Sequence, residues 1–148
     1  MGFFLNIFDY IATHSDTKNT IVMAKEILEL EYHFNTSSKV LFPRLSTAIG
    51  LNEWFADEVN EKDKIFTFRW DREERSAELL AVKEGRSARF HWLDDDDEES
   101  YFEFTLSTTE LTDDLALRIT DFVDADEASE MKELWDAQIS DLKRVLGA

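Results

Sequence analysis

The stretch KIFTFRW, residues 64–70, decides the fold class, because it alternates large aromatic residues with smaller or polar ones. Successive side chains of a β-strand point to opposite faces of the sheet. The alternation therefore predicts a strand with Phe66, Phe68 and Trp70 on one buried face. A sheet made of such strands has an aromatic face that another layer must cover.

Segments on both sides of this stretch repeat the alternation and predict further strands over 26–34, 88–92, 101–108 and 115–119. The segment 77–82 is apolar on both faces, which predicts an internal strand. The links between the later strands are short, which is typical of an antiparallel meander.

Helical signals lie at two places in the chain. A capping sequence at 35–38, followed by apolar residues at helical spacing, predicts a first short helix that Gly50 ends, and 51–56 predicts a second one. From about Asp126 to Leu146, apolar residues recur at steps of three and four, which predicts one long helix. The chain is therefore expected to be α+β, with helices on the aromatic face of one sheet.

The aromatic face and the long helix together define a candidate binding interior. Its predicted lining residues are Tyr32, Trp54, Phe55, Phe66, Phe68, Trp70, Phe90, Trp92, Phe102, Phe104, Met131, Leu134, Trp135 and Gln138. Rigid rings can enclose a ligand pocket, and they can equally fill a solid core. Periodicity alone favours the solid core.

Composition excludes several classes of function. The chain has 148 residues, 33 acidic and 16 basic side chains, a net charge of −17 and no cysteine. A strongly negative surface repels phosphate backbones, so we expect no nucleic-acid partner. No apolar run reaches the length of a membrane span, and the apolar start lacks a basic region typical of a secretory signal. We expect a cytoplasmic protein.

No motif in the chain indicates catalysis, a metal ion or a cofactor. Glycine-rich phosphate loops and nucleophile motifs are missing from the sequence. His91 is expected on the charged face of the sheet, paired with Glu103 or Glu31. The acidic run 94–99 lacks the alternating ligands and the glycine of a calcium loop, so we expect a solvated hairpin loop.

Several short motifs, in this order of elements, resemble the START/SRPBCC helix-grip family. The motifs are GLNEWFADEV at 50–59, RFHWL at 89–93, YFEF at 101–104, ITDF at 119–122 and LWD at 134–136. The similarity is greatest to bacterial START-like proteins related to heat-shock-chaperone ATPase activator homologues. It covers residues 23–148 and leaves residues 1–22 as an N-terminal extension of uncertain role.

The resemblance implies a curved antiparallel sheet wrapped around the long C-terminal helix, with two short helices after the first strand. It also implies a cavity between the sheet and that helix. The leading hypothesis is non-catalytic binding of a small hydrophobic ligand, lipid-like or aromatic, by a monomer or weak dimer. One alternative is a protein-interaction or co-chaperone-like domain with a basic partner, and another is an enzyme acting on a hydrophobic substrate in the same cavity.

Overall fold

The computed structural model describes residues 25–108 and 114–148, where seven strands form one antiparallel sheet in the order β1-β7-β6-β5-β4-β3-β2. The predicted extension 1–22 lies outside the described residues. The strands are β1 (Lys25–Phe34), β2 (Glu58–Lys62), β3 (Ile65–Trp70), β4 (Glu73–Lys83), β5 (Ser87–Trp92), β6 (Phe102–Thr108) and β7 (Leu115–Asp124). The first strand thus pairs with the last, and the strands between follow one another as a meander.

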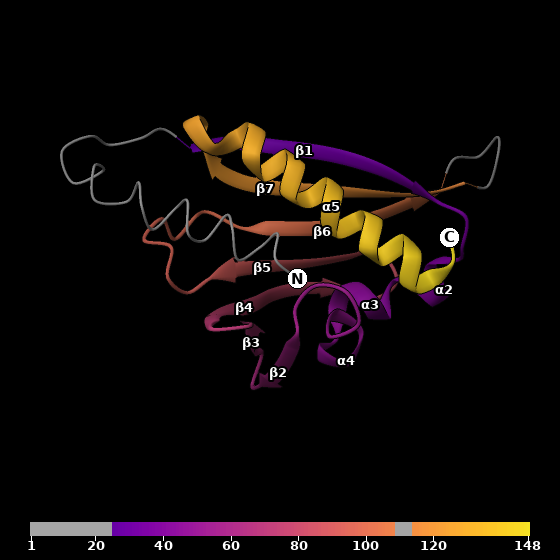
Figure 1. The fold of residues 1–148 in the computed structure, drawn as a ribbon, viewed down its shortest axis with the longest axis horizontal. Coiled ribbons are helices and arrows are strands. Elements are labelled where there is room, and N and C mark those ends of the chain that lie inside the picture. Colours follow the sequence, from indigo (N-terminus) through magenta and orange to yellow (C-terminus); the bar gives the residue numbers. More distant parts are fainter. Residues whose placement is uncertain (1–24, 109–113) are drawn as a thin grey trace.

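The helices cover one face of this sheet. They are α2 (Ser38–Leu41), α3 (Pro43–Ser46), α4 (Ala48–Leu51), the 3-10 turn η2 (Ala125–Glu127) and α5 (Ala128–Leu146). In Figure 1, α5 runs diagonally across β1, β7 and β6, and the three short helices lie near its C-terminal end. This arrangement confirms the α+β helix-grip fold that the sequence predicts.

Strand register sets which residues face α5. Phe66 lies opposite Ala77, and Phe90 lies opposite Phe102. Directly opposed residues of an antiparallel pair share a face of the sheet. All four are at most 3% exposed, which marks the inner face. On the outer face, Arg89 lies opposite Glu103.

Two local predictions need correction. Strand β2 was not expected, because its sequence EVNEK has one apolar residue and it lies at an edge of the sheet, where only one residue is buried. The connection after β1 contains three four-residue helices instead of two, and 52–55 form turns. Gly50 lies inside α4 and does not end a helix.

Helix α5 ends with a recognisable local signal. Gly147 adopts a left-handed conformation (φ 68°), and its N–H donates to the carbonyl groups of Arg144 and Lys143. The inward stripe consists of Leu134, Trp135, Gln138, Ile139 and Leu142, all of which are buried. None of the helices in the described ranges is long and apolar enough to cross a membrane.

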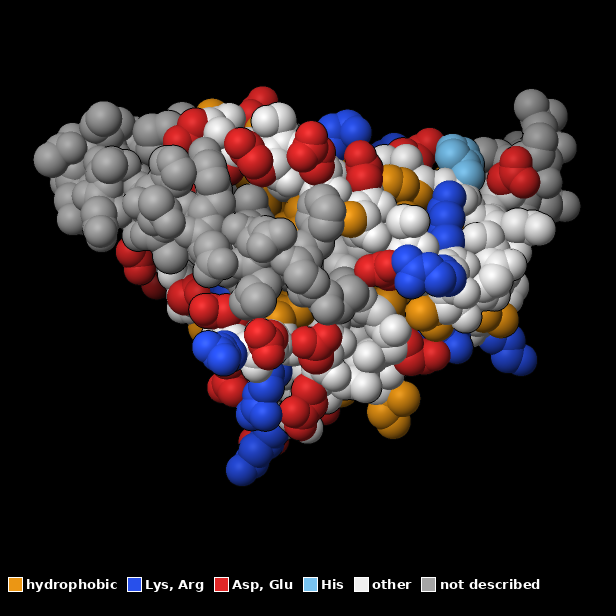
Figure 2. Space-filling view, viewed as in Figure 1, with side chains coloured by type: hydrophobic (Ala, Val, Ile, Leu, Met, Phe, Trp, Pro, Cys, Tyr) orange, Lys and Arg blue, Asp and Glu red, His pale blue; other side chains and the backbone are white. Residues whose placement is uncertain are grey.

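The visible surface mixes charges of both signs, with many acidic side chains. Figure 2 shows Asp and Glu side chains spread around patches of Lys and Arg. Several are paired: Arg69 contacts Glu58 at 3.2 Å and Glu74 at 3.5 Å, and Lys132 contacts Asp136 at 3.0 Å. Such exposed pairs contribute little to stability.

Candidate ligand-binding interior

Aromatic rings fill the space between the sheet and α5. Phe55 lies at the centre of this interior, and its ring centroid is 5.0 Å from that of Phe68, 5.9 Å from Trp70, 6.2 Å from Phe102 and 6.0 Å from Trp135. Edge-to-face and stacked rings at these distances stabilise one another beyond the burial of their area. In this conformation the rings contact each other directly.

The structure brings the predicted lining residues together around these rings. Eleven are buried: Trp54, Phe55, Phe66, Phe68, Trp70, Phe90, Phe102, Phe104, Leu134, Trp135 and Gln138. Tyr32, Trp92 and Met131 are half-buried at the margin. Their assignment to ligand contact stays a prediction, because packing in the interior is compatible with both a core and a binding site.

One backbone carbonyl organises the polar contacts of the interior. The carbonyl oxygen of Phe55 accepts hydrogen bonds from Trp70 Nε1 and from Gln138 Nε2, both at 2.9 Å. The loop that carries Phe55 is held further by Trp54 Nε1, which donates to the Arg44 carbonyl at 2.8 Å. It is also held by the N–H of Val59, which donates to the side chain of Asn52 at 2.8 Å. The loop is therefore fixed against both the sheet and α5.

Asp121 is a buried carboxyl that sequence reasoning did not select as a site residue. It is 5% exposed, and its Oδ2 accepts a hydrogen bond from Trp135 Nε1 at 2.9 Å. Burial raises the pKa of Asp121 to about 6, while the bond from Trp135 and the charges of Arg75 and Lys25 act in the opposite direction. The available sequence signal was its position, because Asp121 lies two residues after the inward Ile119 and therefore on the same face of β7.

We expect Trp135→Phe to raise the pKa of Asp121 further. The substitution keeps an aromatic ring and removes the indole N–H that favours the carboxylate. Loss of one hydrogen bond to a charged group corresponds to a rise of about one pKa unit. Titration of the Asp121 carboxyl carbon by NMR measures this shift, and an unchanged or lower pKa would contradict the role given to Trp135.

Tyr32 connects the margin of the interior to α5. Its hydroxyl donates to Asp136 Oδ1 at 2.6 Å. Partial burial and this bond to the Asp136 carboxylate raise the pKa of Tyr32 above its usual range. The phenol is therefore neutral and acts here as a hydrogen-bond donor that joins β1 to the helix.

A shallow cleft opens beside the interior. It has a volume of about 320 Å³ and lies between the loop that follows α4 and the C-terminal half of α5. Its lining residues are Asn52, Glu53, Trp54, Ala56, Asp57, Asp141, Arg144 and Val145. The size is near the lower limit of small-molecule pockets.

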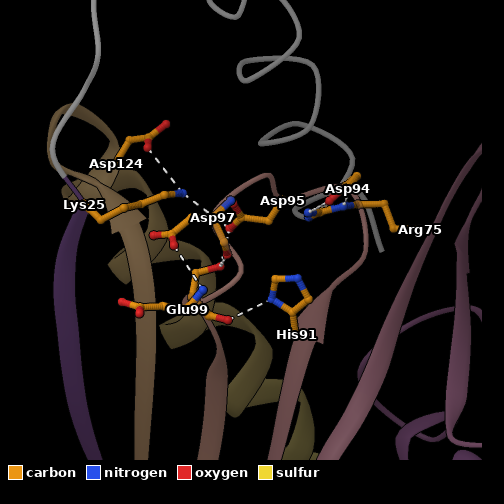
Figure 3. Close-up of polar contacts among 9 residues, drawn as sticks. Lys25, Arg75, His91, Asp94, Asp95, Asp97, Glu99 and Asp124 are labelled. Carbon is orange, nitrogen blue, oxygen red and sulfur yellow. Dashed lines mark hydrogen bonds and ion pairs between the residues drawn. The ribbon is translucent and has the colours of Figure 1, made fainter.

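On the charged face of the sheet, His91 has a different partner from the one predicted. His91 Nδ1 lies 2.8 Å from the carbonyl oxygen of Ser100 (Figure 3), so the predicted pairing with Glu103 or Glu31 is wrong. Glu103 instead accepts from Arg89 Nε at 2.8 Å. The contact of His91 orients its ring against the β5–β6 loop.

The acidic loop between β5 and β6 uses its carboxylates locally. Asp95 Oδ1 accepts from the N–H of Asp97 at 2.9 Å, and Asp97 Oδ1 accepts from the N–H of Glu99 at 3.0 Å. Lys25 Nζ lies 3.4 Å from Asp95 Oδ2 and 3.5 Å from Asp124 Oδ1 (Figure 3). These contacts tie the loop to the start of β1.

One group of carboxylates in the described ranges has oxygens close enough to share a cation. Asp124, Asp126 and Glu127 each place an oxygen within 4.8 Å of the others. The ammonium group of Lys25 contacts Asp124 and already supplies a positive charge to this group of carboxylates. Convergent acidic groups alone do not identify a calcium or magnesium site, since such ions require six or more oxygen ligands.

Comparisons with known proteins agree with the fold. The model of the START-like superfamily domain matches residues 22–148. A Bacteroides fragilis protein, solved by NMR in solution, is 47% identical with a TM-score of 0.61, and the match covers 84% of this chain and 93% of that chain. No curated protein matches the sequence significantly.

More distant solved structures share the fold. The Aha1 dimer of Colwellia psychrerythraea is 15% identical with a TM-score of 0.69, over 80% of this chain and 93% of that chain. A putative protein of the dynemicin biosynthetic locus, DynU16, is 13% identical with a TM-score of 0.68, over 84% of this chain and 48% of that chain. The family match over residues 22–148, together with the fold, shows that this chain belongs to the START-like superfamily.

Proposed function

We propose that this domain is a cytoplasmic, non-catalytic binding protein for a small hydrophobic ligand, lipid-like or aromatic. The ligand would occupy the interior between the sheet and α5. Residues 1–22 would form an extension of this domain. The observation that carries the proposal is the aromatic inner face, where rings from β3, β6 and α5 converge around Phe55.

The cleft next to Phe55 supports this proposal because it lies beside the aromatic interior. Trp54 and Ala56, the neighbours of Phe55, line it, and so do Asp141 and Val145 of α5. A ligand that entered here would displace ring contacts around Phe55 and leave the Phe55 carbonyl bonded to Gln138. The displaced rings would contact the apolar ligand in place of one another, so little hydrophobic free energy would be lost.

Native mass spectrometry of freshly purified protein, with a denatured control and solvent extraction, tests for a retained ligand. We expect a mass excess that disappears on denaturation, and the extract identifies its chemical class. For a protein purified without ligand, the neutral fluorescent probe N-phenyl-1-naphthylamine tests the interior directly. Saturable fluorescence enhancement at one site per chain is the expected result.

A matched pair of substitutions distinguishes the interior from the outer face. Trp92 and Tyr101 are both half-buried, and each lies under an arginine, with Arg75 at 4.0 Å and Arg89 at 3.9 Å. Trp92 faces inward, where its ring is 5.0 Å from Phe102, whereas Tyr101 precedes Phe102 and faces outward. We expect Trp92→Leu to weaken probe binding about fivefold, by the loss of one aromatic contact, and Tyr101→Leu to leave it unchanged.

Equal effects of the two substitutions would place the probe outside the interior. Absence of both a retained ligand and saturable probe binding would contradict the proposed function. The net charge of −17 would then make a basic protein partner the next candidate.

A further inference from the structure

Gln138 is a buried polar side chain with one unsatisfied atom. It is the sole glutamine of the 148-residue sequence and is 0% exposed on the inward face of α5. Its Nε2 donates to the Phe55 carbonyl at 2.9 Å. Among the described residues its Oε1 has no hydrogen-bond partner.

The orientation of this amide follows from its surroundings. The Phe55 carbonyl can only accept hydrogen bonds, and it already accepts one from Trp70 Nε1. Turning the amide over would bring two oxygens together, so Nε2 must face Phe55 and Oε1 must face away from it. The unsatisfied atom is therefore an acceptor.

A core that served stability alone would not favour this side chain. Burial of a polar atom without a partner costs free energy, and such atoms are uncommon in native interiors. Leucine or methionine would fill a similar volume with no unsatisfied atom. An acceptor at this place is explained if a donor from outside the chain meets it.

We infer that the ligand proposed above donates a hydrogen bond to Gln138 Oε1, so that it is an aromatic compound with a hydroxyl or N–H group and not a plain hydrocarbon. This inference rests on the proposed function and specifies its ligand chemistry. Gln138 is the specificity-determining residue, and the surrounding rings supply affinity.

The charge of the surroundings restricts the ligand further. Trp135, one helical turn before Gln138, is bonded to the buried carboxyl of Asp121. The whole chain carries a net charge of −17. A carboxylate ligand would meet repulsion here, which favours a neutral or basic donor over a fatty acid.

The position of Gln138 also agrees with access from the cleft. Asp141 and Val145 follow Gln138 by three and seven residues on α5 and line the cleft, and Phe55 lies between two further lining residues. A ligand that entered from the cleft would therefore approach α5 next to the turn that carries Gln138.

Two probes of nearly equal shape test the inference. The hydroxyl of 2-naphthol donates a hydrogen bond, whereas the methyl group of 2-methylnaphthalene does not. Each competes with N-phenyl-1-naphthylamine for the natural protein, for Gln138→Met and for Leu142→Met. Leu142 is a buried apolar residue one turn along α5, so its substitution controls for altered packing.

We expect the natural protein and Leu142→Met to bind 2-naphthol about fivefold more tightly than 2-methylnaphthalene, the gain typical of one neutral hydrogen bond. Gln138→Met should bind both probes equally. If the natural protein bound both equally, or if Gln138→Met kept the preference, the inference would be wrong while the proposed function stood. If neither probe bound, the proposed function itself would fail.

A second measurement needs no substitution. Because the chain has a single glutamine, selective ¹³C labelling of glutamine side-chain carbonyls reports on Gln138 alone. Addition of 2-naphthol should move this resonance, and 2-methylnaphthalene should move it much less. Equal movement with both probes would overturn the hydrogen bond to Oε1.

Discussion

Replacement of Gly50 by alanine is expected to destabilise the domain by about 3 kcal/mol or more, the upper range for overpacking of a buried site. A Cβ atom at this position would lie 2.0 Å from the carbonyl oxygen of Pro43 and 2.5 Å from the Cα of Arg44. Both atoms belong to the backbone of α3, so no side chain can move aside. The two short helices would have to separate.

The affected carbonyl also holds the turn between these helices. The oxygen of Pro43 accepts from the backbone N–H of Thr47 at 3.2 Å and from its hydroxyl at 2.7 Å. The same hydroxyl caps α4 by accepting from the N–H of Gly50 at 3.0 Å. Displacement of Pro43 would therefore weaken the cap of α4 together with the packing.

Gly85→Ala is the matched control for this prediction. Gly85 has a positive φ of 75°, but an added Cβ would meet nothing within 4 Å. We expect a loss of about 1 kcal/mol from backbone strain alone. Urea unfolding of both variants measures the difference, and equal losses would show that α3 and α4 separate without cost.

The role of Gly50 shows where sequence reasoning reached its limit in the fold. A glycine after a helical pattern predicts a helix end, since the left-handed conformation found there favours glycine. In the structure, the close approach of α3 to α4 requires glycine instead. This contact depends on tertiary geometry, which local spacing does not contain. Strand β2 was not predicted for a related reason, because an exposed edge strand has little apolar alternation.

Most of the interior could be predicted, because register follows from periodicity. Phe66, Phe68 and Trp70 alternate along β3, and the side-chain period of two places all three on one face. The same rule places Asp121 inside once the strand is extended, but the predicted strand ended at 119, whereas β7 continues to Asp124. Its partner Trp135 comes from α5, and only the packing of helix on sheet brings the two together.

The unsatisfied oxygen of Gln138 could not be predicted at all. Spacing on α5 placed this residue inside, and that placement is correct. Whether its amide finds partners depends on the position of one carbonyl, that of Phe55, in a loop far along the chain. Periodicity describes faces of elements, whereas hydrogen bonds in an interior depend on individual atoms.

Asp121→Asn is expected to stabilise the domain by about 3 kcal/mol above pH 7, which is the difference between a pKa of about 6 in the folded chain and 3.8 in the unfolded chain. The folded state binds a proton more tightly than the unfolded state. The natural protein therefore keeps its full stability from this group below pH 4 and loses it as the pH rises through about 6. Asparagine does not titrate, so the advantage of the variant should grow over this range.

Asparagine also retains an oxygen that can accept from Trp135 Nε1, so the substitution changes charge with little change in shape. Urea unfolding at several pH values between 4 and 8 measures the effect. Asp96→Asn in the exposed β5–β6 loop is the control and should stay within about 0.5 kcal/mol of the natural protein. A stability difference for Asp121→Asn that did not vary with pH would show that burial does not raise the pKa. If the stability difference varies with pH as expected, asparagine accepts the hydrogen bond from Trp135 without the free-energy cost of a buried charge. Stability alone would then not explain why a carboxyl occupies this position.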